Sequence, residues 1–254
     1  MPLVVLFKTF AVEIAYIFTN LCVFLVKKNK NISKTPLQMK KNLLNYNRRV
    51  LHGRGVAMIW KSLDIRSYST REYLAAYQNL DSAKRARVER TRQRKDRIRT
   101  VAADDLARRM LGEAMGCLPE DVCFTYAENG KPSLLGGGYE LSISHSDDLV
   151  VVAIHEGPVG IDVEHIREVS PRLAKKYFCD DENFYIFGHE AKDTDFEHMA
   201  STDIRMRFFE IWTAKEAYLK CIGEGLSRLR SVNTTHFPFA RHLIDNQYLV
   251  TIYY

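Results

Sequence analysis

Residues 159–164 read Val-Gly-Ile-Asp-Val-Glu, a β-branched run that predicts a strand. Successive side chains of a strand point to opposite faces, so Asp162 and Glu164 project from one side and Ile161 and Val163 from the other. Two like charges side by side are mildly unfavourable unless a cation accompanies them. A strand with one solvent-facing side would also carry them, so the run alone leaves both interpretations open.

A second stretch, residues 211–220, reads Ile-Trp-Thr-Ala-Lys-Glu-Ala-Tyr-Leu-Lys and predicts a helix. The spacing of four places Glu216 and Lys220 on one helix face, with Glu216 at the border of an apolar arc and Lys220 just beyond it. An ordinary surface pair, contributing roughly 0.3–0.5 kcal/mol, is the alternative. With the two acids of the strand, however, three carboxylates could converge on one hard cation such as Mg²⁺. A nearby lysine could then serve the phosphate chemistry that such a cation assists.

Two further motifs precede these stretches in the chain. Gly130-Lys131-Pro132 is a turn by composition, and Ser144-His145-Ser146 follows a strand-like run. With these four motifs in order, the chain closely resembles the Sfp-type 4′-phosphopantetheinyl transferases over about residues 58–237. Each motif alone is common, whereas four with plausible spacing are specific. Members of this family move the phosphopantetheine arm of coenzyme A onto a serine of a carrier protein.

The resemblance implies a role for each polar residue of the motifs. Asp162, Glu164 and Glu216 would hold Mg²⁺ on the coenzyme A pyrophosphate. Glu216, or Glu164 through a water molecule, would take the proton from the carrier serine. Lys220 would steady or protonate the leaving 3′,5′-ADP. His145, which without the family would be an ordinary loop histidine, would bind a phosphate.

The resemblance also implies where the nucleotide end of coenzyme A binds. The turn of Gly130, Lys131 and Pro132 would lie against the adenine and 3′-phosphate region. Basic residues of the run 84–99 would clamp the 3′-phosphate, and the candidates are Lys84, Arg85 and Arg99. A solvated helix face is the alternative for this run. A nucleic-acid-binding helix is not expected, because the run lacks interleaved aromatic and base-reading polar residues.

The charge of the chain is divided unevenly. Of the net charge of +6, residues 1–56 carry +9, since they hold ten Lys/Arg and one acid, Glu13. This leaves −3 for residues 57–254, so the basic pI does not indicate a nucleic-acid-binding domain. With 254 residues and 46% hydrophobic content, the chain can bury a sizeable core.

Residues 1–56 are predicted to lie outside the folded domain, 57–254. Residues 3–26 are mostly apolar, but their longest charge-free run, 14–26, is shorter than the ~20 residues that span a bilayer. Residues 27–56 are basic and aperiodic, as in a linker. Three origins remain open: a start codon assigned too far upstream, a membrane contact through residues 1–26, or a docking arm. Lys8 and Glu13 count against the membrane contact.

The patterns along residues 57–254 predict an α+β protein. Strands are expected at 58–65, 122–126, 139–144, 149–155, 159–164, 232–237 and 248–254. Helices are expected at 84–111, 171–178 and 203–222, and residues 69–72 are expected to cap a further short helix. The acidic residues 180–182 are expected in a solvated loop. The family resemblance implies two similar α/β subdomains packed as a pseudo-dimer, with approximate halves 57–155 and 156–254 and the active site between them.

The five cysteines form no CxxC pair and no zinc spacing, and their number is odd. This usage is typical of a reducing compartment, so we expect free thiols and a cytoplasmic location. The expected partners are coenzyme A and an apo acyl or peptidyl carrier protein, with the enzyme a monomer. Fatty-acid, polyketide and nonribosomal-peptide carriers remain alternatives. Another Mg²⁺-dependent phosphotransferase is a rival interpretation, although no Walker loop or kinase signature supports it.

Overall fold

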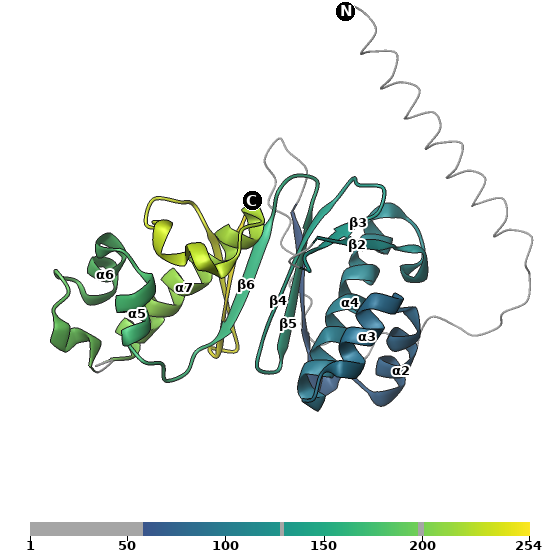
Figure 1. The fold of residues 1–254 in the computed structure, drawn as a ribbon, viewed down its shortest axis with the longest axis horizontal. Coiled ribbons are helices and arrows are strands. Elements are labelled where there is room, and N and C mark those ends of the chain that lie inside the picture. The colour runs from purple at the N-terminus through teal and green to yellow at the C-terminus, as the bar shows by residue number, and fades with distance from the viewer. Residues whose placement is uncertain (1–57, 128–129, 198–200) are drawn as a thin grey trace, which may run out of the picture. The chain divides into compact units, whose positions relative to one another are not determined.

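The computed structural model describes residues 58–127, 130–197 and 201–254, and Figure 1 shows their arrangement. The expectations for residues 1–56, including a membrane contact, lie outside these residues. Among the helices that are described, none is both long and apolar enough to cross a membrane. Four cysteines of this part, Cys117, Cys123, Cys179 and Cys221, carry free thiols, as predicted.

The first half of the described chain is built from one antiparallel sheet and three helices. The sheet has the order β1-β5-β4, from strands β1 (Ile59–Asp64), β4 (Glu140–Ser146) and β5 (Leu149–His155). The helices are α2 (Thr70–Asn79), α3 (Ser82–Arg90) and α4 (Arg94–Met115). A separate hairpin pairs β2 (Phe124–Tyr126) with β3 (Pro132–Leu134). Helix α2 begins with the predicted capping box of Ser69 and Glu72.

The second half repeats this connectivity. Its sheet has the order β6-β8-β7, from strands β6 (Gly160–His165), β7 (Ala240–Ile244) and β8 (Tyr248–Tyr253). The helices are α5 (Arg172–Tyr177), α6 (Asp180–Phe187) and α7 (Thr202–Ile222). In each half the first strand pairs with the last strand, and a long helix precedes the final hairpin. The mixed α+β class predicted from the sequence is therefore confirmed.

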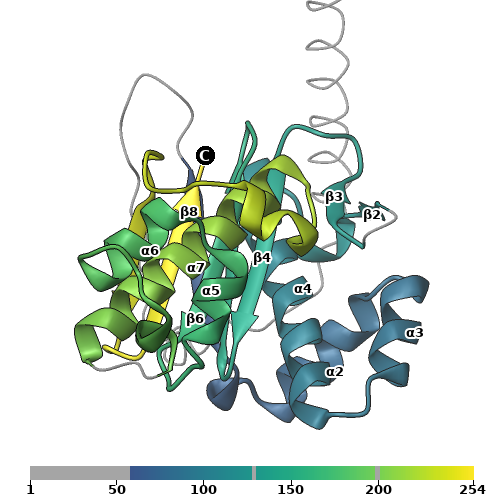
Figure 2. The same cartoon turned by 60° about the vertical axis from the view of Figure 1, so that its left-hand side comes forward.

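The two sheets pack against each other, and helices cover their outer faces, as both Figure 1 and Figure 2 show. Strand β5 is buried on both sides. Val150, Val152 and Ile154 pack on the helices of the first half, while Val151 and Ala153 join the core between the sheets. In β6, Ile161 and Val163 also enter this core. The alternation of a strand thus leaves Asp162 and Glu164 on the opposite face, as predicted.

Three element predictions were wrong in detail. The helix expected over 84–111 is two helices, because Thr91 leaves the helical conformation while its backbone N–H and hydroxyl bond the Arg87 carbonyl. Residues 180–182 begin α6 rather than a solvated loop, and the Glu182 side chain is fully buried. The strand expected at 232–237 is absent from the described part of the chain, where β7 occupies 240–244 instead.

A buried ion pair explains two of these differences. Lys215 of α7 lies 2.7 Å from Glu182 of α6, and both side chains are 0% exposed. Lys215 Nζ also donates to the Leu229 and Val232 carbonyls. Glu182 accepts from the backbone N–H and the hydroxyl of Thr234. These bonds hold the 229–234 segment against the two helices, so its polar backbone groups are not free to form a sheet ladder.

Strand β6 and helix α7 approach each other closely at Gly160. A Cβ atom built there would lie 1.8 Å from the Ala217 carbonyl oxygen and 2.6 Å from the Cys221 backbone nitrogen. Ala217 and Cys221 directly follow Glu216 and Lys220 along the helix. Only glycine permits this contact between backbones, so it sets the distance between β6 and the polar residues of α7.

Candidate active site

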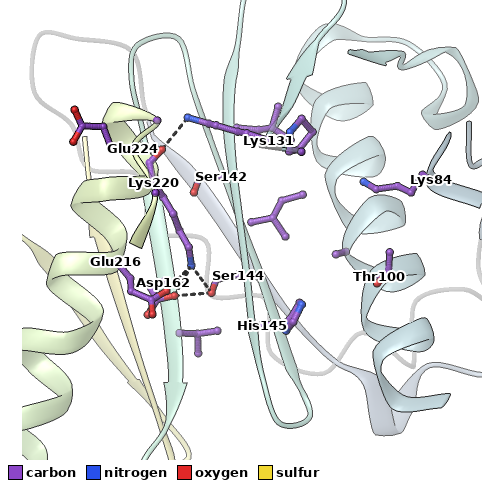
Figure 3. A pocket seen from close by; sticks show the side chains of 18 of the residues that line it. Lys84, Thr100, Lys131, Ser142, Ser144, His145, Asp162, Glu216, Lys220 and Glu224 are labelled. Carbon is purple, nitrogen blue, oxygen red and sulfur yellow. Dashed lines mark hydrogen bonds and ion pairs between the residues drawn. The ribbon is translucent and has the colours of Figure 1, made fainter. Parts of the chain in front are cut away.

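A cavity of about 690 Å³ is lined by residues of both halves. Figure 3 shows β4 and β6 at its centre, with α4 on one side and the C-terminal part of α7 on the other. The polar lining residues of the second half include Asp162, Glu164, Glu216, Lys220 and Glu224. Those of the first half include Lys84, Arg87, Thr100, Lys131 and His145. The cavity therefore has an acidic wall facing a basic one.

Lys220 is at the centre of the acidic wall (Figure 3). Its Nζ lies 2.5 Å from Asp162 Oδ1 and 3.5 Å from Glu216 Oε2, and it donates to Ser144 Oγ at 2.8 Å. Burial alone would lower the pKa of Lys220, but Asp162 and Glu216 together hold it above its ordinary value. Lys220 therefore remains a cation, in contact with a nearly fully buried Asp162.

Glu216 has an unusual acidity for a carboxyl group. Burial, followed by the repulsion of Asp162 and Glu164, raises its pKa to about 7, although Lys220 acts in the opposite direction. A carboxyl group with this pKa exchanges a proton readily near neutral pH. Glu164 accepts hydrogen bonds from Ser146 Oγ at 2.8 Å and from Arg167 Nη1 at 3.0 Å. The sequence-predicted acids are thus brought to one wall.

The donor set fits a divalent cation. Within the described ranges, no three Asp, Glu, His or Cys side chains lie close enough together to hold a metal ion. The charge of Asp162 is balanced by Lys220. However, Asp162 Oδ2 is buried and has no hydrogen-bond partner among the described residues. Such an orphaned acceptor is costly unless a ligand completes it. An oxygen of this kind beside two further carboxylates suits a hard cation.

His145 lies on β4 and lines the cavity between the two walls. Burial, followed by the nearby cations Arg99 and Lys220, lowers its pKa below the ordinary value. His145 is therefore neutral near pH 7 when no anion is present. An anion that contacted it would favour the protonated form and raise its pKa again.

The turn of Gly130, Lys131 and Pro132 also lines the cavity. Gly130 has φ of 81°, a left-handed conformation that glycine adopts at low cost, and Pro132 begins β3. Lys131 Nζ donates to the backbone carbonyl of Lys220 at 2.8 Å. The turn therefore contacts the C-terminal end of α7, where a cation is favourable.

The basic run divides into residues that reach the cavity and residues that do not. Lys84 reaches it and is held by the buried Asp104 at 2.9 Å. Arg85 does not line the cavity; its Nη2 donates to the carbonyls of Gln78 and Leu80. Arg99 does not line it either, since it donates to Asp96 Oδ1 and to the Asp147 carbonyl.

Arg87 and Thr100 are among the lining residues that sequence reasoning missed. Arg87 follows Lys84 by three positions and therefore shares its helix face, whereas Arg85 points about 100° away. Helical spacing within α3 was the signal that could have identified Arg87. Thr100 faces the cavity from α4, and its hydroxyl donates to the Asp96 carbonyl. A lone threonine in a basic helix gives no comparable signal.

The fold and the cavity together define a class of protein. It is a two-part α+β protein whose acidic cluster suits a divalent cation and whose basic wall suits a ligand with several phosphates. A family model described as 4′-phosphopantetheinyl transferase superfamily matches residues 158–251. A second, described as 4′-phosphopantetheinyl transferase, N-terminal, matches residues 67–157. Their junction falls between β5 and β6, where the two halves of the fold meet.

Curated relatives agree with these matches. The chain is 32% identical to 4′-phosphopantetheinyl transferase gsp of Aneurinibacillus migulanus, over 63% of this chain and 59% of the relative. It is 32% identical to psf-1 of Bacillus pumilus, over 57% and 58%, and to Sfp of Bacillus subtilis (strain 168), over 57% and 60%. The match thus spans less than two thirds of these relatives' own lengths. The chain belongs to the Sfp-type 4′-phosphopantetheinyl transferase family.

Proposed function

We propose that this chain transfers the 4′-phosphopantetheine moiety of coenzyme A to a serine of an apo acyl or peptidyl carrier protein. The second product is 3′,5′-ADP. Family membership supports this activity. The single observation that carries it is the cluster of Asp162, Glu216 and Lys220 in a cavity whose other wall is basic. A coenzyme A molecule has a pyrophosphate and a separate 3′-phosphate, which such a two-sided cavity can accommodate.

Mg²⁺ is part of this proposal, with Asp162, Glu164 and Glu216 as its protein ligands. The Oδ2 atom of Asp162, which has no hydrogen-bond partner among the described residues, is the first oxygen available to it. When bound, the cation would neutralise the pyrophosphate and polarise its oxygens. The three carboxylates outnumber the two cations that pair with them, Lys220 and Arg167, so a dication would balance charges that otherwise repel each other.

The protein groups divide the proton chemistry between them. Glu216, or Glu164 through a water molecule, would accept the proton of the attacking serine. The positive charge of Lys220 would stabilise the phosphate oxygen of the leaving 3′,5′-ADP. His145 would contact a phosphate and gain a proton there. The cavity contributes further by holding both substrates in one orientation.

The 3′-phosphate is assigned to the basic wall, with Lys84 and Arg87 as its contacts and Thr100 beside them. The turn 130–132 would lie against the adenine. Arg85 and Arg99 are replaced as candidates by Arg87, because their side chains bond elsewhere. Arginine can pair with a phosphate through two N–H groups at once.

Replacing Arg87 by Ala should raise the KM for coenzyme A by about 10–100-fold, since a hydrogen bond to a charged group contributes about 1.5–3 kcal/mol. The KM for dephospho-coenzyme A, which lacks the 3′-phosphate, should change less than about threefold. Steady-state kinetics with both donors measure this. Arg85→Ala is the matched control, two positions away on the same helix, and should leave both KM values nearly unchanged. An equal effect of the two variants would remove Arg87 from the phosphate contact.

The remaining expectations follow the same proposal. The equivalent strand orders of the two halves support a pseudo-twofold arrangement with the active site between them. The free thiols support a cytoplasmic location. We propose a monomer that meets coenzyme A and the carrier protein, without a nucleic-acid partner.

Mass spectrometry tests the proposed function directly. The full chain is incubated with coenzyme A, Mg²⁺ and an apo carrier protein, and the carrier is weighed intact. A gain equal to one phosphopantetheine group is expected, and a carrier with its acceptor serine replaced by Ala should show none. No gain with fatty-acid, polyketide and nonribosomal-peptide carriers would contradict the proposal. Salt-sensitive DNA binding without a mass gain would instead favour a nucleic-acid-binding protein.

A further inference from the structure

Three serines on β4 form a row along the boundary between the two sheets. Ser142, Ser144 and Ser146 occupy alternate positions, so their side chains share one face of the strand. This serine row meets β6, which belongs to the other sheet. Ser142 Oγ accepts from the Ile161 backbone N–H at 3.0 Å, and Ser146 Oγ accepts from the His165 N–H at 3.1 Å. The two strands thus run in the same direction, joined by hydroxyl groups.

The members of the row differ in what else they contact. Ser144 Oγ donates to Asp162 Oδ1 at 2.7 Å, and Ser146 Oγ donates to Glu164 Oε2 at 2.8 Å. Ser142 contacts no carboxylate among the described residues. Joining two strands requires only the bonds to backbone N–H groups. The two bonds to carboxylates are additional, and they go to the two acids of β6 that line the cavity.

The bond from Ser144 fixes the orientation of a buried carboxylate. Asp162 Oδ1 receives both the Ser144 hydroxyl and the Lys220 ammonium group, whereas Oδ2 receives no hydrogen bond from the described residues. Ser144 and Asp162 are 8% and 2% exposed, so water cannot easily replace the hydroxyl. Without it, the carboxylate could rotate and satisfy Oδ2 in another way. The serine, together with Lys220, therefore determines which oxygen stays available.

We propose that Ser144 and Ser146 are positioning residues for the divalent cation. Their hydroxyl groups orient Asp162 and Glu164 so that the other oxygen of each carboxylate is directed to the metal. This inference rests on the proposed function, because it needs the metal that the function implies. Groups that hydrogen-bond a metal ligand typically affect metal affinity by about 10–100-fold. Ser142, by contrast, only joins β4 to β6 through its bond to the Ile161 N–H.

Mn²⁺ binding, followed by electron paramagnetic resonance, tests this inference without measuring activity. Mn²⁺ is titrated into the full chain in the presence of coenzyme A. Ser144→Ala and Ser146→Ala should each raise the Kd for Mn²⁺ by about tenfold or more. Ser142→Ala is the matched control, from the same face of the same strand. It should change the Kd less than about twofold, even if all three variants lower the Tm to a similar extent.

A conservative substitution guards against loss of folding. Ser146→Thr keeps the hydroxyl at a half-buried position and should bind Mn²⁺ nearly as well as the unsubstituted chain. An unchanged Kd in the folded Ser144→Ala and Ser146→Ala variants would overturn the inference and leave the proposed function intact. An equal rise in the Kd of all three Ala variants would mean that the serine row only joins the two strands. If the unsubstituted chain binds no Mn²⁺, the metal assignment itself is wrong, and the inference with it.

Discussion

Asp162→Asn is expected to reduce kcat/KM for phosphopantetheine transfer by about 100–1000-fold. Asparagine has nearly the shape of aspartate and can still accept hydrogen bonds from Ser144 and Lys220 through its oxygen. It removes the negative charge and the carboxylate oxygen, without a partner among the described residues, that the cation would use. Neutralisation by a metal supplies several kcal/mol of transition-state stabilisation, and each 1.4 kcal/mol corresponds to about tenfold in rate.

The assay measures kcat/KM with coenzyme A and apo carrier protein at saturating Mg²⁺, and circular dichroism monitors the fold. Asp193→Asn is a matched control, because Asp193 is highly exposed and pairs with an exposed Lys175. This control should retain nearly full activity. If Asp162→Asn stayed within about threefold of the unsubstituted chain, Asp162 would not be a metal ligand and the cluster would need another explanation.

The largest effect on stability is expected from Glu182→Gln. This change leaves Lys215 fully buried without its counter-ion. Removing one partner of a buried ion pair costs about 3–5 kcal/mol of unfolding free energy. For a domain of this size, 1 kcal/mol corresponds to about 2–4 °C in Tm, so the Tm should fall by about 6–20 °C.

Urea unfolding and thermal unfolding of the full chain measure this change. The exposed pair of Lys175 and Asp193 again provides the comparison, since surface pairs contribute at most about 1 kcal/mol. Asp193→Asn should therefore shift the Tm by no more than about 4 °C. A similarly small shift for Glu182→Gln would mean that the carbonyl groups of Leu229 and Val232 satisfy Lys215 without the glutamate.

The features that the sequence predicted correctly depend on short-range periodicity. Asp162 and Glu164 share a face because a strand alternates with a period of two, and this is visible in six residues. Glu216 and Lys220 meet because a helix brings residues four apart together. In both cases the pattern and its structural consequence lie within the same element. Neighbouring elements were not needed to place these side chains on one face.

The features that the sequence missed depend on long-range contacts. Residues 180–182 look like a solvated acidic loop until Lys215, more than thirty positions later, is packed against Glu182. Arg85 and Arg87 look equivalent as basic residues of one run. They differ because Arg85 bonds the carbonyl groups that end α2, and only the packed fold shows where α2 ends. Helical spacing places Arg87 on the same face as Lys84, but the run alone does not show which face of the helix meets the cavity.

The close contact at Gly160 has a consequence for redesign of the cavity. The spacing between the acids of β6 and the polar groups of α7 is set by backbone against backbone, so no rotamer change can absorb a side chain at position 160. In a mutant library, variants substituted at position 160 would therefore largely have a displaced α7. Thr100 and Ala103 line the cavity from α4 instead. Substitutions at these two positions could alter donor selectivity while the spacing between the acids and Lys220 is retained.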